Sequence, residues 1–233
     1  MERDMDQLER MACTPQPIHL DAFNPNVLLP FGCTVDHLFS AMDDFINFLG
    51  FVNSQLHTRQ MPRLESLLMP ANFSSVVSEY MNVTIPKYCS SLARNTYHNG
   101  HPDLLPAGLF PNNSVQYSHE GIEVKASRYL KNWQGHNAEE SWLMVFVFDS
   151  NRPNDHTQPK PIYPKPFRFI KIVGARLQKS DWKEQPRGDA SRRTATATIL
   201  PSGYDKMEAN WIYRDSGFDE KTSEVPDEEV TLQ

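Results

Sequence analysis

The apolar run Trp142-Leu143-Met144-Val145-Phe146-Val147-Phe148 constrains the fold of this chain more than any other segment. It is short and continuous, and polar loops bound it on both sides. Such a run is typical of a central strand that is buried on both faces of a sheet. A second strand with a partly buried pattern is predicted over 167–177. We therefore predict an α/β fold in which helices flank a mixed central sheet.

Apolar residues at helical spacing predict a first helix over about 34–56. Thr34 suits the N-cap position, and Asp36 follows in the first turn. The apolar stripe is typical of core or dimer packing and comprises Leu38, Met42, Phe45, Ile46, Leu49 and Val52. Residues 1–30 contain several prolines and are predicted to be irregular.

Prolines divide the chain after this helix. A short helical piece is predicted over 62–68, and Pro70 breaks it. Asn72 is predicted to cap a further helix over about 72–81. These pieces predict an N-terminal helical region over 1–84.

The last part of the chain alternates between strand, helix and loop signals. Thr and Ala repeat with period two in 192–200, which predicts a strand with a hydroxyl face. Pro201 then starts a short helix that is predicted to reach Trp211. The segment 150–166 is predicted to be a long loop, and the acidic tail 214–233 is predicted to be flexible.

The composition suits one sizeable globular core, since 39% of the 233 residues are hydrophobic. No apolar run is long enough to span a bilayer, and the charged N-terminus is unlike a signal peptide. Cys13, Cys33 and Cys89 are scattered and lack the CxxC spacing of a zinc site, so we interpret them as reduced thiols. These features predict a cytoplasmic protein without membrane contact.

The net charge of −6 hides an uneven distribution of charge. Residues 1–52 and the C-terminal tail are acidic, whereas residues 160–193 form a basic block. Because phosphate contacts need positive potential only locally, this block is a candidate nucleic-acid surface. A solvated surface of mixed charge is the alternative.

Three ionisable residues stand at a spacing that suits metal-dependent hydrolysis. Glu123 and Lys125 are two apart in an apolar segment, so they should point to the same face of a strand. Asp103, which follows Pro102, can reach that face from the end of a neighbouring strand. Two carboxylates hold a hard cation such as Mg2+, and a lysine beside them can orient water or stabilise charge at a phosphate. Gly121, just before the strand, suits a close backbone approach.

The pair Pro102-Asp103 followed by Glu123-x-Lys125 resembles the active site of the PD-(D/E)xK nucleases, a superfamily that includes most type II restriction endonucleases. The resemblance covers mainly residues 95–150. It implies a Mg2+-dependent DNA endonuclease, in which Mn2+ can substitute for Mg2+. It also implies that the restriction-endonuclease-like core occupies residues 85–213.

The resemblance assigns roles to individual residues. It implies that Asp103, Glu123 and the carbonyl of Val124 bind the metal, while Lys125 acts on the water. Some members of the superfamily carry an extra acidic residue on the helix before the Pro-Asp strand, and Glu79 could be that residue. In addition, His136 in a predicted loop is a candidate for phosphate contact or for assisting the water.

Double-stranded DNA is the predicted partner, and a homodimer is the predicted assembly, because cutting both strands of a palindrome needs two active sites. Basic residues are predicted to contact phosphates, and the Thr-rich strand with its preceding arginines is predicted to read bases. The candidate contacts are Lys171, Arg176, Lys179, Arg192, Arg193, Thr196 and Thr198. The sequence contains no P-loop and no dinucleotide-binding pattern, so no nucleotide cofactor is predicted.

Two alternatives stay open on the sequence. A nuclease of the same superfamily could act in repair, recombination or phage defence, and sequence-specific cleavage separates it from a restriction enzyme. A Glu-x-Lys pair also occurs by chance on exposed strands. In that case the chain would be a non-catalytic DNA-binding or assembly protein, which divalent-metal binding would test.

Overall fold

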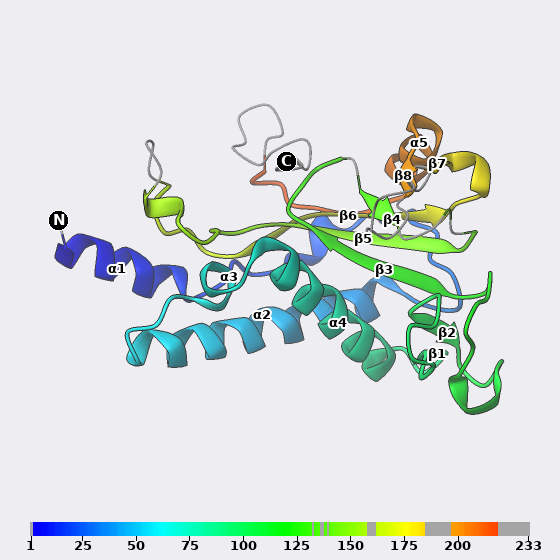
Figure 1. Ribbon diagram of the computed structural model, residues 1–233, viewed down its shortest axis with the longest axis horizontal. Helices are drawn as coiled ribbons and strands as arrows, with labels where there is room; N and C mark the ends of the chain where they lie inside the picture. The colour runs from blue at the N-terminus through cyan, green and yellow to red at the C-terminus, as the bar shows by residue number, and fades with distance from the viewer. Residues whose placement is uncertain are drawn as a thin grey trace, which may run out of the picture.

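The computed structural model describes residues 2–131, 133–135, 138, 140–157, 162–184 and 197–218. Six strands of these segments form one mixed sheet (Figure 1). Its spatial order is β1 (Leu92–Arg94), β2 (Leu104–Pro106), β3 (Ile122–Ser127), β5 (Trp142–Asp149), β6 (Arg168–Arg176) and β9 (Trp211–Arg214). The pair β3 and β5 is parallel, and the other neighbouring pairs are antiparallel. The predicted α/β fold with a mixed central sheet is confirmed.

The strand β5 is the buried centre of this sheet. Every residue from Trp142 to Asp149 is buried, and the strand pairs with β3 on one side and with β6 on the other. Its side chains alternate between two cores. Trp142, Met144, Phe146 and Phe148 pack into one core, and Leu143, Val145 and Val147 pack into the other. The predicted central strand with two buried faces is therefore confirmed.

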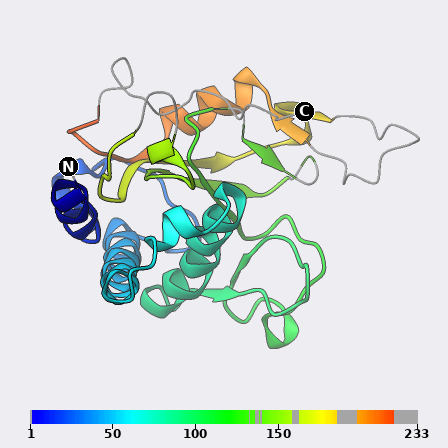
Figure 2. The ribbon, with the colours of Figure 1, turned by 60° about the vertical axis from the view of Figure 1, so that its left-hand side comes forward.

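A helical layer covers one face of the sheet (Figures 1 and 2). Its helices are α1 (Glu2–Ala12), α2 (Val35–Thr58), α3 (Leu64–Leu67) and α4 (Pro70–Tyr88). The two long helices, α2 and α4, pack together and run in opposite directions (Figure 1). Phe45 of α2 and Phe73 of α4 lie against Phe167, with ring centroids 5.4 Å and 6.0 Å away. Aromatic packing of this kind fixes the helices to the sheet.

The start of α2 agrees with the sequence. Thr34 is the N-cap, and its hydroxyl accepts the His37 N–H at 3.4 Å. In return, His37 Nδ1 accepts the Thr34 N–H at 3.1 Å. This reciprocal capping box satisfies two backbone donors that the first turn leaves open, and the predicted helix from Thr34 is confirmed.

The opposite face of the sheet is covered by α5 (Pro201–Ala209) and a small antiparallel sheet (Figure 1). This small sheet has the order β4 (Gln134–Gly135), β8 (Ala197–Ile199) and β7 (Trp182–Glu184). Met207, Trp182 and Ile199 form the second core with the alternate residues of β5. Short 3-10 turns lie at Leu20–Ala22, Pro111–Asn113, Asp155–Thr157 and Lys179–Asp181.

The segment after α1 reaches the far edge strand β9. Phe23 forms an isolated antiparallel bridge with Tyr213, and the two rings are 5.0 Å apart. The Asn24 N–H donates to the Ile212 carbonyl at 3.0 Å. Residues from the two ends of the described chain therefore close one side of the core that underlies the helices.

Three predicted boundaries are wrong. The first 30 residues are not irregular throughout, because α1 occupies Glu2–Ala12 and the prolines that favour a loop follow it. The two helices on either side of Leu68 and Met69 are as predicted, but Asn72 does not cap the second one, whose N-cap is Met69. Pro70 is the first residue of α4, where a missing N–H loses no intrahelical bond, and the helix continues past the predicted end at 81 to Tyr88. Trp211 is not part of the last helix, because it pairs with β6 as the first residue of β9.

Some predicted features fall partly outside the described residues. Of the predicted strand 192–200, the described part is β8 at 197–199. The predicted flexible tail lies outside the described residues from 219 onward. In the described part of the chain, no helix combines the length and the apolar character that crossing a membrane requires.

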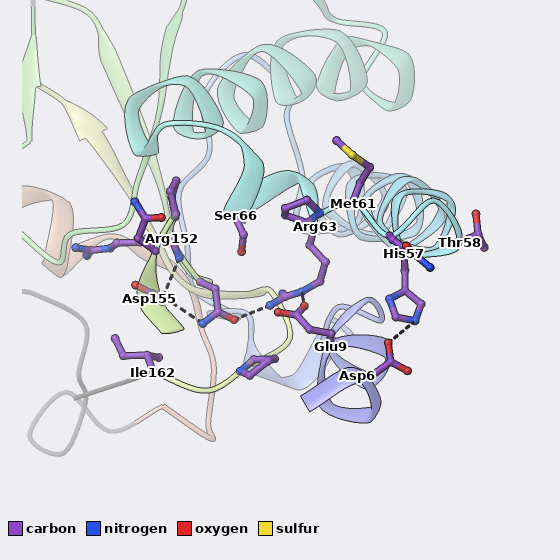
Figure 3. Close-up of a pocket in the computed structure, with 16 residues that line it drawn as sticks. Asp6, Glu9, His57, Thr58, Met61, Arg63, Ser66, Arg152, Asp155 and Ile162 are labelled. Carbon is purple, nitrogen blue, oxygen red and sulfur yellow. Dashed lines mark hydrogen bonds and ion pairs between the residues drawn. The ribbon is translucent and has the colours of Figure 1, made fainter. Parts of the chain in front are cut away.

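A buried arginine joins the N-terminal helices to the loop after β5 (Figure 3). Arg63 is only 2% exposed. Its Nε donates to Glu9 at 2.8 Å, its Nη1 to Glu65 at 2.6 Å and its Nη2 to Asn151 at 2.7 Å. A cavity of about 670 Å³ opens beside these groups. Because the guanidinium is engaged with three separate segments, we assign it a structural role.

Replacing Arg63 with methionine should destabilise the protein by about 3–5 kcal/mol, since it leaves the buried Glu65 carboxylate without its cation. Denaturant unfolding measures this loss. The matched control is Arg59→Met, because Arg59 is exposed and the change should stay within about 0.5 kcal/mol. Equal unfolding free energies for the two variants would contradict a structural role for the Arg63 ion pairs.

Candidate active site

The strands β2 and β3 bring Asp103 and Glu123 side by side. These strands are antiparallel and pair Leu104 with Ile122, so the next position in this register sets Asp103 opposite Glu123. Gly121 permits the approach of the two strands. Its φ is +145°, and a Cβ at this position would overlap the carbonyl oxygen of Leu104. The predicted close backbone approach at Gly121 is confirmed.

The strand β3 divides its side chains between the core and the candidate site. Ile122 and Val124 pack into the core beneath the helices. Residues at alternate positions point to the other face of the strand, and there the Lys125 Nζ lies 3.1 Å from Glu123 Oε1. The prediction that Glu123 and Lys125 share a face is confirmed.

Asp103 and His101 complete the cluster from the segment that leads into β2. Asp103 Oδ2 accepts the backbone N–H of Val124 at 2.9 Å. Glu123 Oε2 lies 3.2 Å from His101 Nδ1. The Glu123 carboxylate is thus held between a lysine and a histidine, and the residue is only 4% exposed.

Burial and charge act differently on the two carboxyl groups. Burial, followed by the neighbouring charge of Glu123, raises the pKa of Asp103 well above its ordinary value. Burial also acts to raise the pKa of Glu123, but Lys125 and His101 outweigh it and hold that pKa below its usual range. The negative charge of Glu123 therefore makes ionisation of Asp103 less favourable, and a bound cation would relieve this repulsion.

These groups fit a hard divalent cation, which prefers oxygen ligands. Glu123 supplies carboxylate oxygens from β3, and Asp103 supplies them from the position directly before β2. In a β-strand, the N–H and C=O of one residue point to the same side. The Val124 carbonyl therefore faces the edge at which Asp103 binds the Val124 N–H. Asp103, Glu123 and Val124 together form the candidate metal site.

Asn95 holds the backbone that carries Asp103. The Asn95 N–H donates to the Asp103 carbonyl at 2.8 Å. Its side-chain Nδ2 donates to the carbonyls of Pro102 at 3.0 Å and Val115 at 2.8 Å. Because Asn95 is itself buried, these bonds fix the segment from outside the cluster of charges.

An open cavity of about 930 Å³ borders the candidate site. Asp103 and His101 line it, together with Glu79 of α4 and Arg94 of β1. The Arg94 Nη2 donates to Glu79 at 2.6 Å, and the two side chains are 53% and 59% exposed. The structure therefore places Glu79 on the same cavity as Asp103, with its carboxylate bound to Arg94.

His101 is the candidate functional residue that the sequence analysis does not single out. It contacts Glu123 directly and lines the cavity beside Asp103. Its position directly before the Pro-Asp pair was the available signal. A histidine in a polar loop has no periodic pattern, so its direction toward Glu123 depends on the pairing of β2 with β3.

The predicted DNA contacts are spread over several elements. Lys171 is buried, and its Nζ lies 2.7 Å from Glu208, so we remove it from the candidate interface. Arg176 is half exposed and pairs with Glu120 at 3.3 Å. Lys179 is exposed, and Thr198 is partly exposed on β8. The remaining candidates lie outside the described residues, namely His136, Arg192, Arg193 and Thr196.

Acidic partners neutralise part of the basic block. Lys165 pairs with Asp149 at 2.7 Å, and Arg168 lies between Asp149 at 3.5 Å and Asp215 at 3.6 Å. The local positive potential of this segment is therefore lower than its sequence alone suggests.

No protein-family model, no curated protein and no solved structure matches this chain. The chemistry of the site is therefore the basis for a proposed function.

Replacing Gly121 with alanine should weaken Mn2+ binding by about 10–100-fold, because the added Cβ forces β3 away from β2 and separates the two carboxylates. Calorimetric titration measures this affinity. Gly108→Ala is the matched control, since Gly108 also has a positive φ, of +77°, but an added Cβ meets no atom within 4 Å. Equal affinities in the two variants would contradict the link between strand approach and metal binding.

Proposed function

We propose that this protein is a Mg2+-dependent endonuclease that hydrolyses phosphodiester bonds in double-stranded DNA, as a type II restriction endonuclease does. The observation that carries the proposal is the meeting of Asp103, Glu123 and Lys125 where β2 joins β3. The mixed sheet, with Glu123 and Lys125 on β3 and Asp103 directly before the neighbouring strand β2, supports a restriction-endonuclease-like core.

Each residue of the cluster has a role that its position allows. Asp103, Glu123 and the Val124 carbonyl would hold Mg2+, which supplies positive charge at the phosphate and acidifies a water. Lys125 positions the attacking water and offsets the negative charge that develops on the phosphate. His101 positions Glu123 through their 3.2 Å contact.

The cavity beside the site suits the sugar-phosphate backbone. Arg94 lines it and is 53% exposed, so its guanidinium can pair with a phosphate next to the one that is cleaved. Arg94 would then exchange its bond to the Glu79 carboxylate for a bond to the phosphate. In this proposal Glu79 is an accessory residue that controls the orientation of Arg94.

A homodimer is part of the proposal. Two copies related by a two-fold axis present two identical sites, and these can cut the two strands of a palindromic sequence. Cleavage into discrete fragments would support a restriction enzyme. A smear of fragments would instead support another nuclease of the same superfamily, acting in repair, recombination or phage defence.

Plasmid DNA should be cut in the presence of Mg2+ and left intact with Ca2+, because Ca2+ is larger and activates water poorly. Asp103→Ala and Glu123→Ala should abolish cleavage and also weaken metal binding. Gel electrophoresis and calorimetry measure the two effects separately. Cleavage that persists after exhaustive chelation would contradict the assignment of the metal site.

Lys125→Ala should abolish cleavage while DNA binding in Ca2+ stays near that of the wild type, since Lys125 acts on water and not as a ligand. Lys131→Ala is the matched control, because Lys131 is an exposed lysine outside the cluster. If the K125A variant cuts at the wild-type rate, the cluster is a set of surface charges, and a non-catalytic DNA-binding or assembly role replaces the nuclease proposal.

Arg176→Ala and Lys179→Ala should weaken binding to specific and scrambled duplexes equally, and each should lower the salt slope by about one. Removing a base contact should instead relax the sequence preference, and the predicted contacts of that kind are Arg192, Arg193, Thr196 and Thr198. Binding in Ca2+ across a salt series measures both effects. Unchanged affinity, discrimination and salt slope in a double variant at Arg192 and Arg193 would remove these arginines from the interface.

A further inference from the structure

Two cysteines and a histidine meet on the side of the helical layer nearest β1. The candidate ligand atoms of Cys33, His37 and Cys89 all lie within 4.8 Å of one another. Within the residues that the structure describes, this is the one group of three or more such side chains close enough to share an ion. It is separate from the cluster around Asp103 and Glu123.

The packing of α2 against α4 creates this group. Cys33 stands directly before the N-cap of α2, and His37 lies in the first turn of the same helix. Cys89 is the C-cap of α4. Because the two helices run in opposite directions, the start of α2 meets the end of α4 (Figure 1). The absence of CxxC spacing is therefore no obstacle, since the two thiols come from different elements.

The donor set favours zinc over magnesium. Thiolates and imidazole are ligands that Zn2+ prefers, whereas Mg2+ prefers oxygen. With Zn–S distances of about 2.3 Å and Zn–N distances of about 2.1 Å, tetrahedral ligand atoms lie roughly 3.5–3.8 Å apart. The ligand atoms of the group, all within 4.8 Å of one another, lie about 1 Å or less beyond that spacing. Three protein ligands leave the fourth position for a water molecule.

The surroundings of the thiols are already fixed by other contacts. Cys33 and Cys89 are 6% and 0% exposed. The Cys89 Sγ lies 3.1 Å from the Ser91 hydroxyl, which itself donates to the Phe31 carbonyl at 2.6 Å. These bonds connect the loop before α2 to the loop before β1, so the donors are held near one another before any ion arrives.

Two observations work against metal binding and have to be outweighed. Burial, and then the neighbouring Cys89, raises the pKa of the Cys33 thiol to about 12, so an ion must displace a firmly held proton. The Nδ1 of His37 also accepts the Thr34 N–H at 3.1 Å, and ligation would replace that bond. The second half of the capping box, from the Thr34 hydroxyl to the His37 N–H, does not use the ring and can remain.

From this geometry we infer that Cys33, His37 and Cys89 bind a Zn2+ ion that clamps the start of α2 to the end of α4. The strand β1 and then Asn95 follow Cys89 along the chain, and Asn95 holds the backbone of Asp103. The bound ion therefore fixes the start of the segment that runs from Cys89 through β1 to Asn95, beside Asp103. The inference does not rest on the nuclease proposal.

The test is a Co2+ titration of the full-length, reduced and metal-stripped protein. Co2+ bound by two thiolates gives a strong sulfur-to-metal charge-transfer band, which a carboxylate site cannot give. We expect one equivalent of Co2+ to produce this band and Zn2+ to abolish it by displacement. Zn2+ should also raise the melting temperature of the wild-type protein.

Three variants and one control decide the ligands. Cys33→Ser, Cys89→Ser and His37→Gln should each lose the band, or for His37→Gln keep a weaker one, and each should lose the Zn2+-dependent rise in melting temperature. Glutamine preserves the capping box at its third helical position, so H37Q separates ligation from capping. The control is Cys13→Ser, since Cys13 is buried but donates to the Glu9 carbonyl at 3.3 Å and lies outside the group. It should behave as the wild type.

Several results would overturn the zinc site. One is a wild-type protein that shows no charge-transfer band. Another is a disulfide between Cys33 and Cys89 with no Co2+ band after its reduction. A third is an H37Q variant that keeps the full band and the full rise in melting temperature. This last variant decides the question even if both serine variants fail to fold.

Discussion

The burial of β5 on both faces is the constraint on which the rest of this structure depends. Because Trp142–Asp149 exposes neither face, an apolar layer has to cover each side, and α2 with α4 and α5 with the small sheet supply those layers. The strand β3 runs parallel beside β5, so the same two layers determine which side chains of β3 face each core. Val124 fills the core beneath the helices, which leaves Glu123 and Lys125 on the opposite face. Sheet packing thus places Glu123 and Lys125, while the segment before β2 places Asp103 and His101.

The position of Glu123 works against the stability of the fold. A carboxylate with 4% exposure loses most of its hydration, and its contacts with Lys125 and His101 only partly replace that loss. Asp103 then adds a second carboxyl group beside the first. Well-packed apolar residues at these positions would give a more stable sheet. Stability alone therefore gives no reason for this cluster, whereas the proposed binding of a divalent cation would.

Features decided by neighbours along the chain could be predicted, and features decided by distant partners could not. The apolar run of β5, the alternation around Glu123 and the cap at Thr34 each depend on residues within one element. The inward turn of Lys171 depends on an acidic partner on α5, and the meeting of Cys33 with Cys89 depends on the antiparallel packing of α2 and α4. Pro70 misled only the prediction of where α4 begins, because a proline that breaks the interior of a helix fits its first turn.

The partners of the N-terminal segment determine when this protein can fold during its synthesis. A ribosome releases a chain from its N-terminus, so α1 and Phe23 emerge before the strands of the sheet. The hydrogen bond from Arg63 to Asn151 can form only after Asn151 has emerged, and the bridge between Phe23 and Tyr213 only after the far edge strand has emerged. Until that strand emerges, the core beneath the helices lacks one wall and its aromatic side chains stay in contact with water. The core beneath the helices can therefore be completed only after residue 213 has left the ribosome.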